Sequence, residues 1–403
     1  MKVVLSYSGG LDTSVILKML QEKLNAEVVT VTVDVGQRDD FQEIEEKAYG
    51  LGAVKHYTVD ARKEFVENYV FPAIKANALY DGEYPLATAL ARPLIARKLV
   101  EIAELEGGDA IAHGCTGKGN DQVRFDISIK TLNPDIKIIA PVRECNLSRD
   151  WEMEYAKRHG IPVSEKIYSI DENLWGRSIE GGALENPWEE PPEEIYEWTK
   201  IQNEGEEYIE IGFEKGVPVA LNGEKKAPVE IIEDLNIIAG AYGIGRIDHI
   251  ENRVVGIKSR EIYEAPAAEV ILKAHKDLEK LVLTKWILEF KDLVDSKWAW
   301  VVYSGLWFEP LRYALDAFID LVEEKVSGVV KIKLSPNHAT VVGRESPYAL
   351  YSLNLATYEG TSAFEQDLAT GFIEIFGMQS VLANRHKIRP EGLKEKIIES
   401  RAV

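Results

Sequence analysis

The chain has 403 residues, of which 45% are hydrophobic and 28% are charged, and its formal net charge is −20. A chain of this length can bury the cores of two domains. A surface this acidic repels phosphate backbones, so we expect no nucleic-acid partner. A nucleotide can still bind, because local backbone amides and Mg²⁺ hold its phosphates.

Membrane segments, disulfides and metal sites are not expected. The longest apolar runs, such as 3–5 and 28–33, are far too short to span a bilayer, and no signal-peptide pattern opens the chain, which predicts a cytoplasmic protein. Cys115 and Cys145 are the only cysteines, which excludes a disulfide framework and a zinc site built from cysteines. The seven histidines show no metal-ligand spacing, so no metal-ligating side chain is predicted.

Residues 1–165 alternate between strand and helix patterns. Apolar residues of the first helix recur with a spacing near 3.6, and the second strand is rich in valine, as expected for a strand buried on both faces. We predict strands at 2–6, 27–33, 54–59, 110–113 and 136–140, and helices at 12–23, 41–51, 63–78, 87–106 and 148–160. This alternation indicates an α/β domain with a doubly wound parallel sheet.

The pattern changes after about residue 165. Proline and acidic residues cluster at 186–194, and two alternating segments at 208–213 and 217–221 flank a Lys215-Gly216 turn, which is typical of antiparallel strands. Helices are predicted at 229–241 and 267–282, and strands at 329–334, 339–343 and 371–375. We therefore predict an α+β domain over 166–379.

The last residues, 380–403, form a charged tail that is predicted to be helical from residue 390 onward. Such a tail often packs on a neighbouring subunit, which makes it a candidate oligomerisation arm. The alternative is a frayed terminus.

The strongest local signal is Ser8-Gly9-Gly10-Leu11-Asp12-Thr13-Ser14, which follows the first predicted strand and opens the first helix. Hydroxyl groups and free N–H groups at a helix N-terminus bind anions, and the two glycines let the backbone approach a phosphate. The segment matches neither a Walker A loop nor a Gly-x-Gly-x-x-Gly fingerprint. The alternative reading is a well-capped turn without a ligand.

This loop resembles the pyrophosphate-binding loop of the ATP pyrophosphatase superfamily. The resemblance implies that residues 1–165 are a nucleotide-binding domain in which the loop and Mg²⁺ stabilise a departing pyrophosphate while a nucleophile attacks the α phosphorus. Val33 ends the second predicted strand, at the sheet edge where such folds bind ligands, and is assigned to the adenosine. An ordinary strand end explains Val33 equally well.

A second constellation, residues 113–125, also follows a predicted strand. It reads His-Gly-Cys-Thr-Gly-Lys-Gly-Asn-Asp-Gln-Val-Arg-Phe and combines glycines with a hydroxyl, an amide, a carboxylate and a guanidinium. A polar surface loop is the alternative. This mixture of donors and acceptors suits an amino-acid substrate that carries both charges.

Together these segments resemble argininosuccinate synthase, from the first strand to about residue 377. The most specific strings are residues 116–125 and the Glu-Asn-Arg…Lys-Ser-Arg…Ile-Tyr block between 251 and 263. The resemblance extends to Tyr84-Pro85-Leu86, Leu90-Ala91-Arg92-Pro93, 169–174, 176–178, 243–248 and 343–347.

The resemblance implies that the protein uses ATP to join citrulline and aspartate into argininosuccinate through a citrullyl-adenylate, with release of AMP and pyrophosphate. A homotetramer is implied in the same way. The implied ATP site, with Mg²⁺, is Ser6, Tyr7, Ser8, Gly9, Gly10, Leu11, Asp12, Thr13, Ser14, Val33 and Gly114. The implied substrate-binding residues are Tyr84, Thr116, Asn120, Asp121, Arg124, Ser169, Ser178, Glu251 and Tyr263, and the catalytic candidates are Asp12, Asp121 and Arg124.

Each polar candidate also has a structural reading. Arg124 suits the carboxylate of citrulline, and Glu251 suits its ammonium, but either could be a surface charge. Asp121 would hold the ammonium of aspartate or cap a helix. Ser169 and Ser178 could be turn hydroxyls, and the two tyrosines could be partly buried aromatics.

One position departs from the family pattern. Ala89 stands where family members usually carry a serine that bonds citrulline. Water or Thr88 are the candidate replacements, and the missing hydrogen bond is worth about 0.5–1.5 kcal/mol.

Two other hypotheses fit less of the chain. An ammonia-dependent synthetase of the same superfamily would need a glutaminase or a partner, and no glutaminase nucleophile context is present. A nucleotide-binding regulator without turnover would not need a second substrate pocket.

Overall fold

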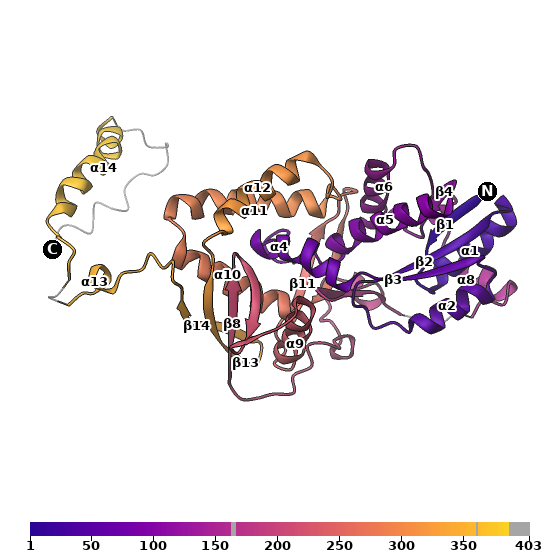
Figure 1. The fold of residues 1–403 in the computed structure, drawn as a ribbon, viewed down its shortest axis with the longest axis horizontal. Coiled ribbons are helices and arrows are strands. Elements are labelled where there is room, and N and C mark those ends of the chain that lie inside the picture. The colour runs from indigo at the N-terminus through magenta and orange to yellow at the C-terminus, as the bar shows by residue number, and fades with distance from the viewer. Residues whose placement is uncertain (163–166, 360–361, 387–403) are drawn as a thin grey trace. The chain divides into compact units, whose positions relative to one another are not determined.

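The computed structural model describes residues 1–162, 167–359 and 362–386 (Figure 1). The chain forms two compact units, Met1–Leu350 and Tyr351–Val403. The helix predicted from residue 390 onward lies outside the described residues. The domain boundaries predicted at 165 and 379 stay predictions. In the described ranges, every helix is too short or too polar to cross a bilayer.

The first sheet is parallel and has the strand order β3-β2-β1-β4-β5. Its strands are β1 (Lys2–Ser6), β2 (Glu27–Asp34), β3 (Lys55–Asp60), β4 (Ala110–Ala112) and β5 (Lys137–Ile139). β1 pairs with both β2 and β4, so that Val3 lies opposite Val28 on one side and Ala110 on the other. The chain winds outward from β1 in one direction and then from β4 in the other, so the topological switch point lies between these two strands.

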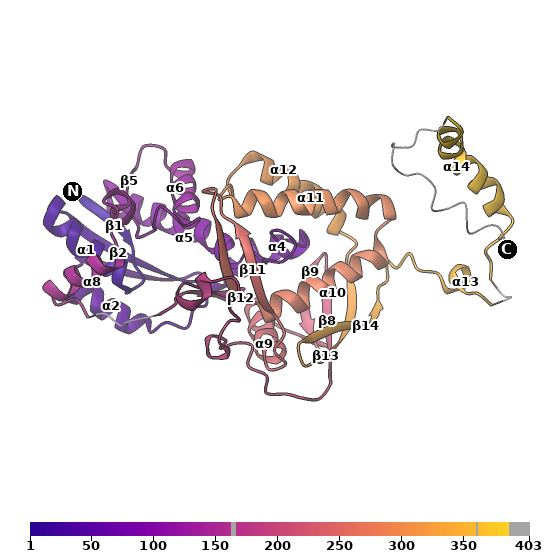
Figure 2. The same ribbon diagram turned by 180° about the vertical axis from the view of Figure 1, so that it is seen from behind.

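Helices cover both faces of this sheet, and the prediction of a doubly wound α/β fold is confirmed (Figures 1 and 2). Val3 and Leu5 of β1 belong to one hydrophobic cluster with α1, whereas the intervening Val4 packs in the other cluster with α5. The helices are α1 (Leu11–Leu24), α2 (Phe41–Gly50), α5 (Ala87–Glu106), α6 (Asp121–Leu132), α7 (Pro141–Glu144) and α8 (Arg149–Arg158).

The helix predicted at 63–78 is divided by a wider turn. The structure has α3 (Arg62–Phe65), the π-helix η1 (Val66–Val70) and α4 (Phe71–Lys75). The N–H group of Phe71 bonds the carbonyl of Val66, five residues back. Pro72 follows directly and has no N–H group, so it cannot take part in a regular α-helical ladder at this point.

The second part of the first unit contains an antiparallel sheet with the order β10-β9-β8-β13-β14. The predicted Lys215-Gly216 hairpin is confirmed, with positive φ at both residues. The strands are β8 (Glu207–Glu214), β9 (Val217–Leu221), β10 (Glu224–Lys225), β13 (Gly328–Ser335) and β14 (His338–Glu345). Helices α9 (Pro228–Gly240), α10 (Pro266–Val282), α11 (Lys285–Tyr303) and α12 (Pro310–Glu323) complete the α+β arrangement.

Another antiparallel sheet, with the order β11-β12-β7-β6, was not predicted. Its strands are β6 (Ser169–Asn173), β7 (Gly176–Glu180), β11 (Arg246–Asn252) and β12 (Lys258–Glu264), and the short 3-10 helices η2 (Gly182–Glu185) and η3 (Glu193–Ile195) follow β7. The register places Tyr263 opposite Ser178, and Ser178 opposite Asp171. Three side chains from different strands thereby reach one region.

The second unit, considered alone, contains α13 (Leu353–Ala356) and α14 (Leu368–Arg385). The strand predicted at 371–375 is wrong, because these residues lie inside α14. Leu368, Phe372 and Phe376 recur every four residues, which is a helical spacing, and the two phenylalanine rings stack 5.1 Å apart. All three side chains are exposed.

Glu264 at the end of β12 is fully buried and anchors the segment that follows η3. Its carboxylate accepts hydrogen bonds from the backbone N–H groups of Glu197, Trp198 and Thr199, and from the Thr199 hydroxyl. Arg177 of β7, also buried, donates to the other carboxylate oxygen at 2.6 Å. A buried charge is tolerated when it is paired and hydrogen-bonded in this way.

Replacement of Glu264 by alanine is expected to lower the free energy of unfolding by about 3–5 kcal/mol, because it leaves Arg177 without its closest carboxylate. Guanidinium denaturation checks this. Glu214→Ala is the control, since Glu214 pairs with Lys225 at the surface, and a loss below about 1 kcal/mol is expected there. Equal losses for the two variants would contradict the anchoring role of Glu264.

Candidate active site

The loop between β1 and α1 leaves the first N–H groups of α1 open to a ligand. Gly10 precedes the helix in an extended conformation and has no side chain to cap it. Among the backbone N–H groups of the described residues, the Asp12 carboxylate accepts only from that of its own residue. The hydroxyl oxygens of Ser8 and Thr13 lie 3.3 Å apart beside these N–H groups. Free N–H groups and hydroxyls at the start of a helix form an anion site, as the sequence predicts for this loop.

Lys47 of α2 adds a positive charge to this loop, and sequence reasoning missed it. Its ammonium donates to the Gly9 carbonyl at 2.5 Å from a position 38 residues away in the chain. Burial lowers the pKa of Lys47. No local motif includes this lysine, so only the packing of α2 against the loop reveals it.

The sheet brings the two predicted constellations together. Gly114 follows β4 and lies against the first turn of α1, where a Cβ atom on this glycine would be 3.5 Å from the Cβ of Asp12. Val33 lies one residue before the end of β2, on the other side of β1, and its carbonyl accepts a hydrogen bond from the Gln37 side chain at 2.9 Å. The adenosine contact predicted for the backbone at Val33 stays a prediction, and a contact made through this carbonyl would be shared with Gln37.

Two carboxyl groups with raised pKa values lie near the start of α1. Burial raises the pKa of Asp12, and the charge of Arg149 opposes this shift. Glu152 of α8 is only 4% exposed, and its Oε1 has no hydrogen-bond partner among the described residues. Burial, together with the charge of Asp12, raises the pKa of Glu152 to about 7.

Asp121 lies between two guanidinium groups at the start of α6. Its Oδ1 accepts from Arg124 Nη1 at 3.0 Å, and its Oδ2 accepts from Arg92 Nε at 2.8 Å. Arg92, from α5, also pairs with Asp171 of β6. Burial alone would raise the pKa of Asp121, but the two guanidinium groups hold it below its ordinary value. Asp121 is therefore ionised at neutral pH.

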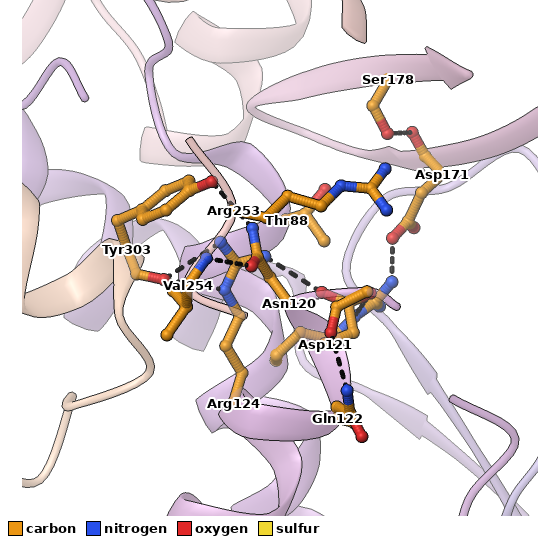
Figure 3. Close-up of polar contacts among 12 residues, drawn as sticks. Thr88, Asn120, Asp121, Gln122, Arg124, Asp171, Ser178, Arg253, Val254 and Tyr303 are labelled. Carbon is orange, nitrogen blue, oxygen red and sulfur yellow. Dashed lines mark hydrogen bonds and ion pairs between the residues drawn. The ribbon is translucent and has the colours of Figure 1, made fainter. Parts of the chain in front are cut away.

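Asn120 connects α6 to the hairpin between β11 and β12 (Figure 3). Its amide nitrogen donates to Tyr303 Oη at 2.8 Å and to Glu251 Oε1 at 3.2 Å. Its amide oxygen accepts from the N–H group of Val254 at 2.7 Å. Arg253, next in the hairpin, donates to the carbonyl of Lys118, so the hairpin contacts the 116–121 loop at two points.

The aromatic side of the site is formed by Tyr84 and Tyr263. Their rings stack with centroids 4.1 Å apart. Tyr263 donates to Glu251 Oε2 at 2.6 Å, and Tyr84 Oη accepts from the N–H group of Thr88 at 2.9 Å. Burial raises the pKa of Tyr84 to about 12 and also raises that of Tyr263 well above its ordinary value. Ala89, beside Thr88, is buried.

The predicted residues do not all join this network. Asn120, Asp121, Arg124, Tyr84, Glu251 and Tyr263 are connected by the contacts above, and Ser178 lies beside Tyr263 in the sheet. Ser169 begins β6 and is exposed, as is Thr116. Neither of their side chains joins the network among the described residues. Sequence reasoning missed Tyr303, and it quoted Arg92, Asp171 and Arg253 only as parts of motifs.

The charges of this cluster suit a zwitterionic ligand. Arg92 and Arg124 offer N–H donors for carboxylates, whereas Asp121 and Glu251 offer acceptors for ammonium groups. The anion site at α1 and the 113–120 loop follow the neighbouring strands β1 and β4. Gly114 of this loop packs against the first turn of α1. The arrangement can thus hold a phosphate ester beside one or more amino acids.

Two family models match most of the chain. The arginosuccinate synthase N-terminal HUP domain matches residues 2–162, and the arginosuccinate synthase C-terminal domain matches residues 168–383. The chain is also similar to a Pyrococcus furiosus protein named argininosuccinate synthase, with 68% identity over 386 residues that cover 95% of this chain and 94% of the relative.

Other proteins of the same name are similar over a comparable length. A Dictyoglomus turgidum relative is 60% identical and covers 94% of this chain and 97% of its own. A Methanocaldococcus jannaschii relative is 58% identical and covers 96% of this chain and 98% of its own.

Glu152→Gln is expected to stabilise the protein in a pH-dependent manner. The carboxyl pKa is raised to about 7 in the folded protein, so the wild type loses stability as the pH rises through the window between about 4.5, the unfolded value, and about 7. Glutamine carries no charge and avoids this loss. Denaturation curves should therefore coincide near pH 4 and show the variant to be more stable near pH 8.

Glu154→Gln is the matched control, since Glu154 lies on the same helix and is 71% exposed. The free energy of unfolding of this control variant is expected to equal that of the wild type at every pH. A constant difference between Glu152→Gln and the wild type across the range would show that ionisation of Glu152 is not the cause.

Proposed function

Because the chain belongs to the argininosuccinate synthase family, we propose that it joins citrulline and aspartate into argininosuccinate while ATP is converted to AMP and pyrophosphate, a step of arginine biosynthesis. The protein is an enzyme, a carbon–nitrogen ligase of this family, and the resemblance predicted from its motifs is confirmed. The observation that carries the proposal is the anion site at α1 beside a cluster with paired charges for amino acids.

The chemistry explains why ATP is required. The ureido carbon of citrulline is a poor electrophile, because both nitrogens donate electrons into the carbonyl, and its oxygen is a poor leaving group. Attack of this oxygen on the α phosphorus forms the P–O bond of a citrullyl-adenylate and releases pyrophosphate. The aspartate amine then attacks the activated carbon, AMP departs with its electron pair, and the nitrogen loses a proton. Holding the three reactants in place supplies much of the rate.

The loop from Ser6 to Ser14 would bind the pyrophosphate portion of ATP. Free N–H groups of α1, the Ser8 and Thr13 hydroxyls and the Lys47 ammonium are the donors available to its oxygens. The Asp12 carboxylate, in the first turn of α1, fits Mg²⁺ because this ion prefers oxygen ligands. Bound there with ATP, Mg²⁺ would neutralise charge on the phosphate oxygens.

Citrulline and aspartate would occupy the cluster around α6. Arg124 suits the citrulline carboxylate and Glu251 its ammonium, with Tyr84 and Tyr263 forming the wall. Asp121 would receive the aspartate ammonium, assisted by Asn120 and Thr116. The two guanidinium groups that keep Asp121 ionised also support this role, since an ionised carboxylate is the better acceptor.

We further propose a homotetramer and a cytoplasmic location. The second unit supports association with other subunits, because Phe372, Ile375 and Phe376 of α14 are 61%, 73% and 76% exposed. Exposed apolar side chains grouped on one helix are typical of interaction surfaces. Sedimentation of the purified protein measures the number of subunits.

Purified protein with ATP, citrulline and aspartate is expected to form AMP and pyrophosphate in equal amounts, and neither without citrulline. If the ureido oxygen of citrulline carries an isotope label, that label should appear in AMP, because this oxygen attacks the α phosphorus. Mass spectrometry of AMP checks it. Formation of ADP and orthophosphate would refute the function, and label retained in argininosuccinate would refute the adenylate.

Asp121→Ala is expected to lower the rate at limiting aspartate by about 10–100-fold. This factor corresponds to the loss of one charge-assisted hydrogen bond to the substrate. The dissociation constant of ATP should change less than about twofold, because the anion site lies on α1. Kinetics and calorimetry measure the two effects.

Asp126→Asn is the control, because Asp126 lies on the same helix, has the same 28% side-chain exposure and also pairs with an arginine. Its kinetics should stay near those of the wild type. Parallel loss of ATP binding and aspartate-dependent rate in Asp121→Ala would contradict the assigned pocket.

A further inference from the structure

Tyr303 reaches the candidate site from a part of the chain that contains no recognisable motif. It is the last residue of α11 and is 1% exposed. Its hydroxyl bonds Asn120, which immediately precedes α6, and Glu251 of β11, and both are predicted substrate residues. The close-up in Figure 3 shows its ring and carbonyl facing Asn120, Arg124 and Val254.

The hydroxyl of Tyr303 joins two predicted substrate residues. It accepts from Asn120 Nδ2 at 2.8 Å and donates to Glu251 Oε1 at 2.7 Å, with the carbonyl of Asn252 as a second acceptor at 3.1 Å. A hydroxyl has one proton to donate, so its orientation decides which of the two oxygens it supports. Burial and the nearby Glu251 carboxylate raise the pKa of Tyr303, so the hydroxyl keeps this proton.

The carbonyl and the ring of Tyr303 hold a third substrate residue. Arg124 donates to the carbonyl from both Nε and Nη2 at 3.1 Å, which leaves Nη1 for Asp121. The guanidinium carbon also lies 5.0 Å from the ring centroid, within cation–π distance. The Tyr303 ring also stacks on the ring of Tyr80, with centroids 3.5 Å apart.

The main chain after Tyr303 is packed tightly against α6. Gly305 has a φ of +80°, and a Cβ atom there would lie 2.9 Å from the Cα of Arg124. Only glycine accommodates both the conformation and this approach without strain. The turn that follows α11 therefore contacts α6 through its main chain, in addition to the hydrogen bonds that Arg124 donates to the Tyr303 carbonyl.

From these contacts we propose that Tyr303 is a positioning residue, which holds Asn120, Arg124 and Glu251 in the geometry required by the citrulline and aspartate pockets. The inference rests on the proposed function and deepens it. Tyr303 touches no reacting atom in this scheme. It acts through the three side chains, and its loss should weaken the binding of both amino acids while leaving the ATP site on α1 intact.

A purely structural role makes a different prediction. A tyrosine that only filled the interior would, when truncated, lower stability and affect all three substrates alike. The Tyr303→Phe variant separates the two roles, because phenylalanine retains the ring contacts and the backbone carbonyl and removes only the hydroxyl. Tyr242→Phe is the matched control, since Tyr242 is also buried and its hydroxyl donates to a glutamate, Glu207, at 3.1 Å.

The experiment measures KM for ATP, citrulline and aspartate, and the calorimetric binding of each, in wild type and both variants. In Tyr303→Phe, the KM values and dissociation constants for citrulline and aspartate are expected to rise about 5–50-fold, because one or two hydrogen bonds that position their pockets are lost. The ATP constant should stay within about twofold, and the melting temperature within a few degrees of that of Tyr242→Phe. Tyr242→Phe should match the wild type in all constants.

The proposal is overturned if Tyr303→Phe behaves as Tyr242→Phe does, or if its ATP constant rises as much as the other two. A double mutant tests the mechanism further, because Tyr303→Phe should add little to Asn120→Ala if the hydroxyl acts through Asn120. Fully additive effects would count against the proposal. Failure of the proposed function is distinct, since the wild type itself would then bind no citrulline or form no AMP.

Discussion

Strands β1 and β4 lie side by side although more than a hundred residues separate them in the chain, and the site depends on this pairing. Two parallel strands end at the same edge of the sheet, and each is followed by a loop that cannot continue the ladder. One loop opens α1 and presents free N–H groups, and the other contains Gly114 and leads to α6. The chain continues from β1 to β2 and β3 on one side and from β4 to β5 on the other, and a junction of this kind is where open α/β sheets bind ligands.

Electrostatic pairing across elements then organises the amino-acid side of the site. Asp121 is held by guanidinium groups from α5 and α6, while the Glu251 carboxylate accepts hydrogen bonds from the hydroxyls of Tyr263 and Tyr303. In an environment of low dielectric, charges held in this way need little reorganisation when a substrate binds. The hairpin between β11 and β12 joins the second part of the unit to the start of α6 through Asn120, so both parts of the unit contribute to one hydrogen-bonded cluster.

The parallel sheet was predictable because β1 and β2 are runs of apolar residues buried on both faces. The β6, β7, β11 and β12 sheet was not, since strands such as Arg246–Asn252 and Lys258–Glu264 alternate charged residues with few apolar ones. Arg177 and Glu264 are buried there as a pair, and composition alone places such residues at a surface.

Some residues of the candidate site could be predicted from the sequence and others could not, and tertiary packing again makes the difference. Residues within contiguous motifs, such as Asn120 to Arg124, were identified by resemblance, although Tyr303, which bonds both Asn120 and Arg124, was not. Lys47 and Tyr303 reach the site only through tertiary packing, and nothing around them in the sequence marks a function. The strand predicted at 371–375 was wrong because these five residues alternate like a strand, whereas the longer segment that forms α14 follows a helical period.

The buried carboxylate of Glu264 has a consequence for how substrate choice can change over evolution. Glu264 follows Tyr263 on β12, so the anchor that ties this strand to residues 197–199 also fixes one wall of the proposed citrulline pocket. A substitution that shifted this wall would disturb a buried ion pair. The first turn of α5, Ala87 to Leu90, contains no charged side chain. A substitution at Ala89 would therefore alter the same proposed pocket without disturbing an ion pair of this kind.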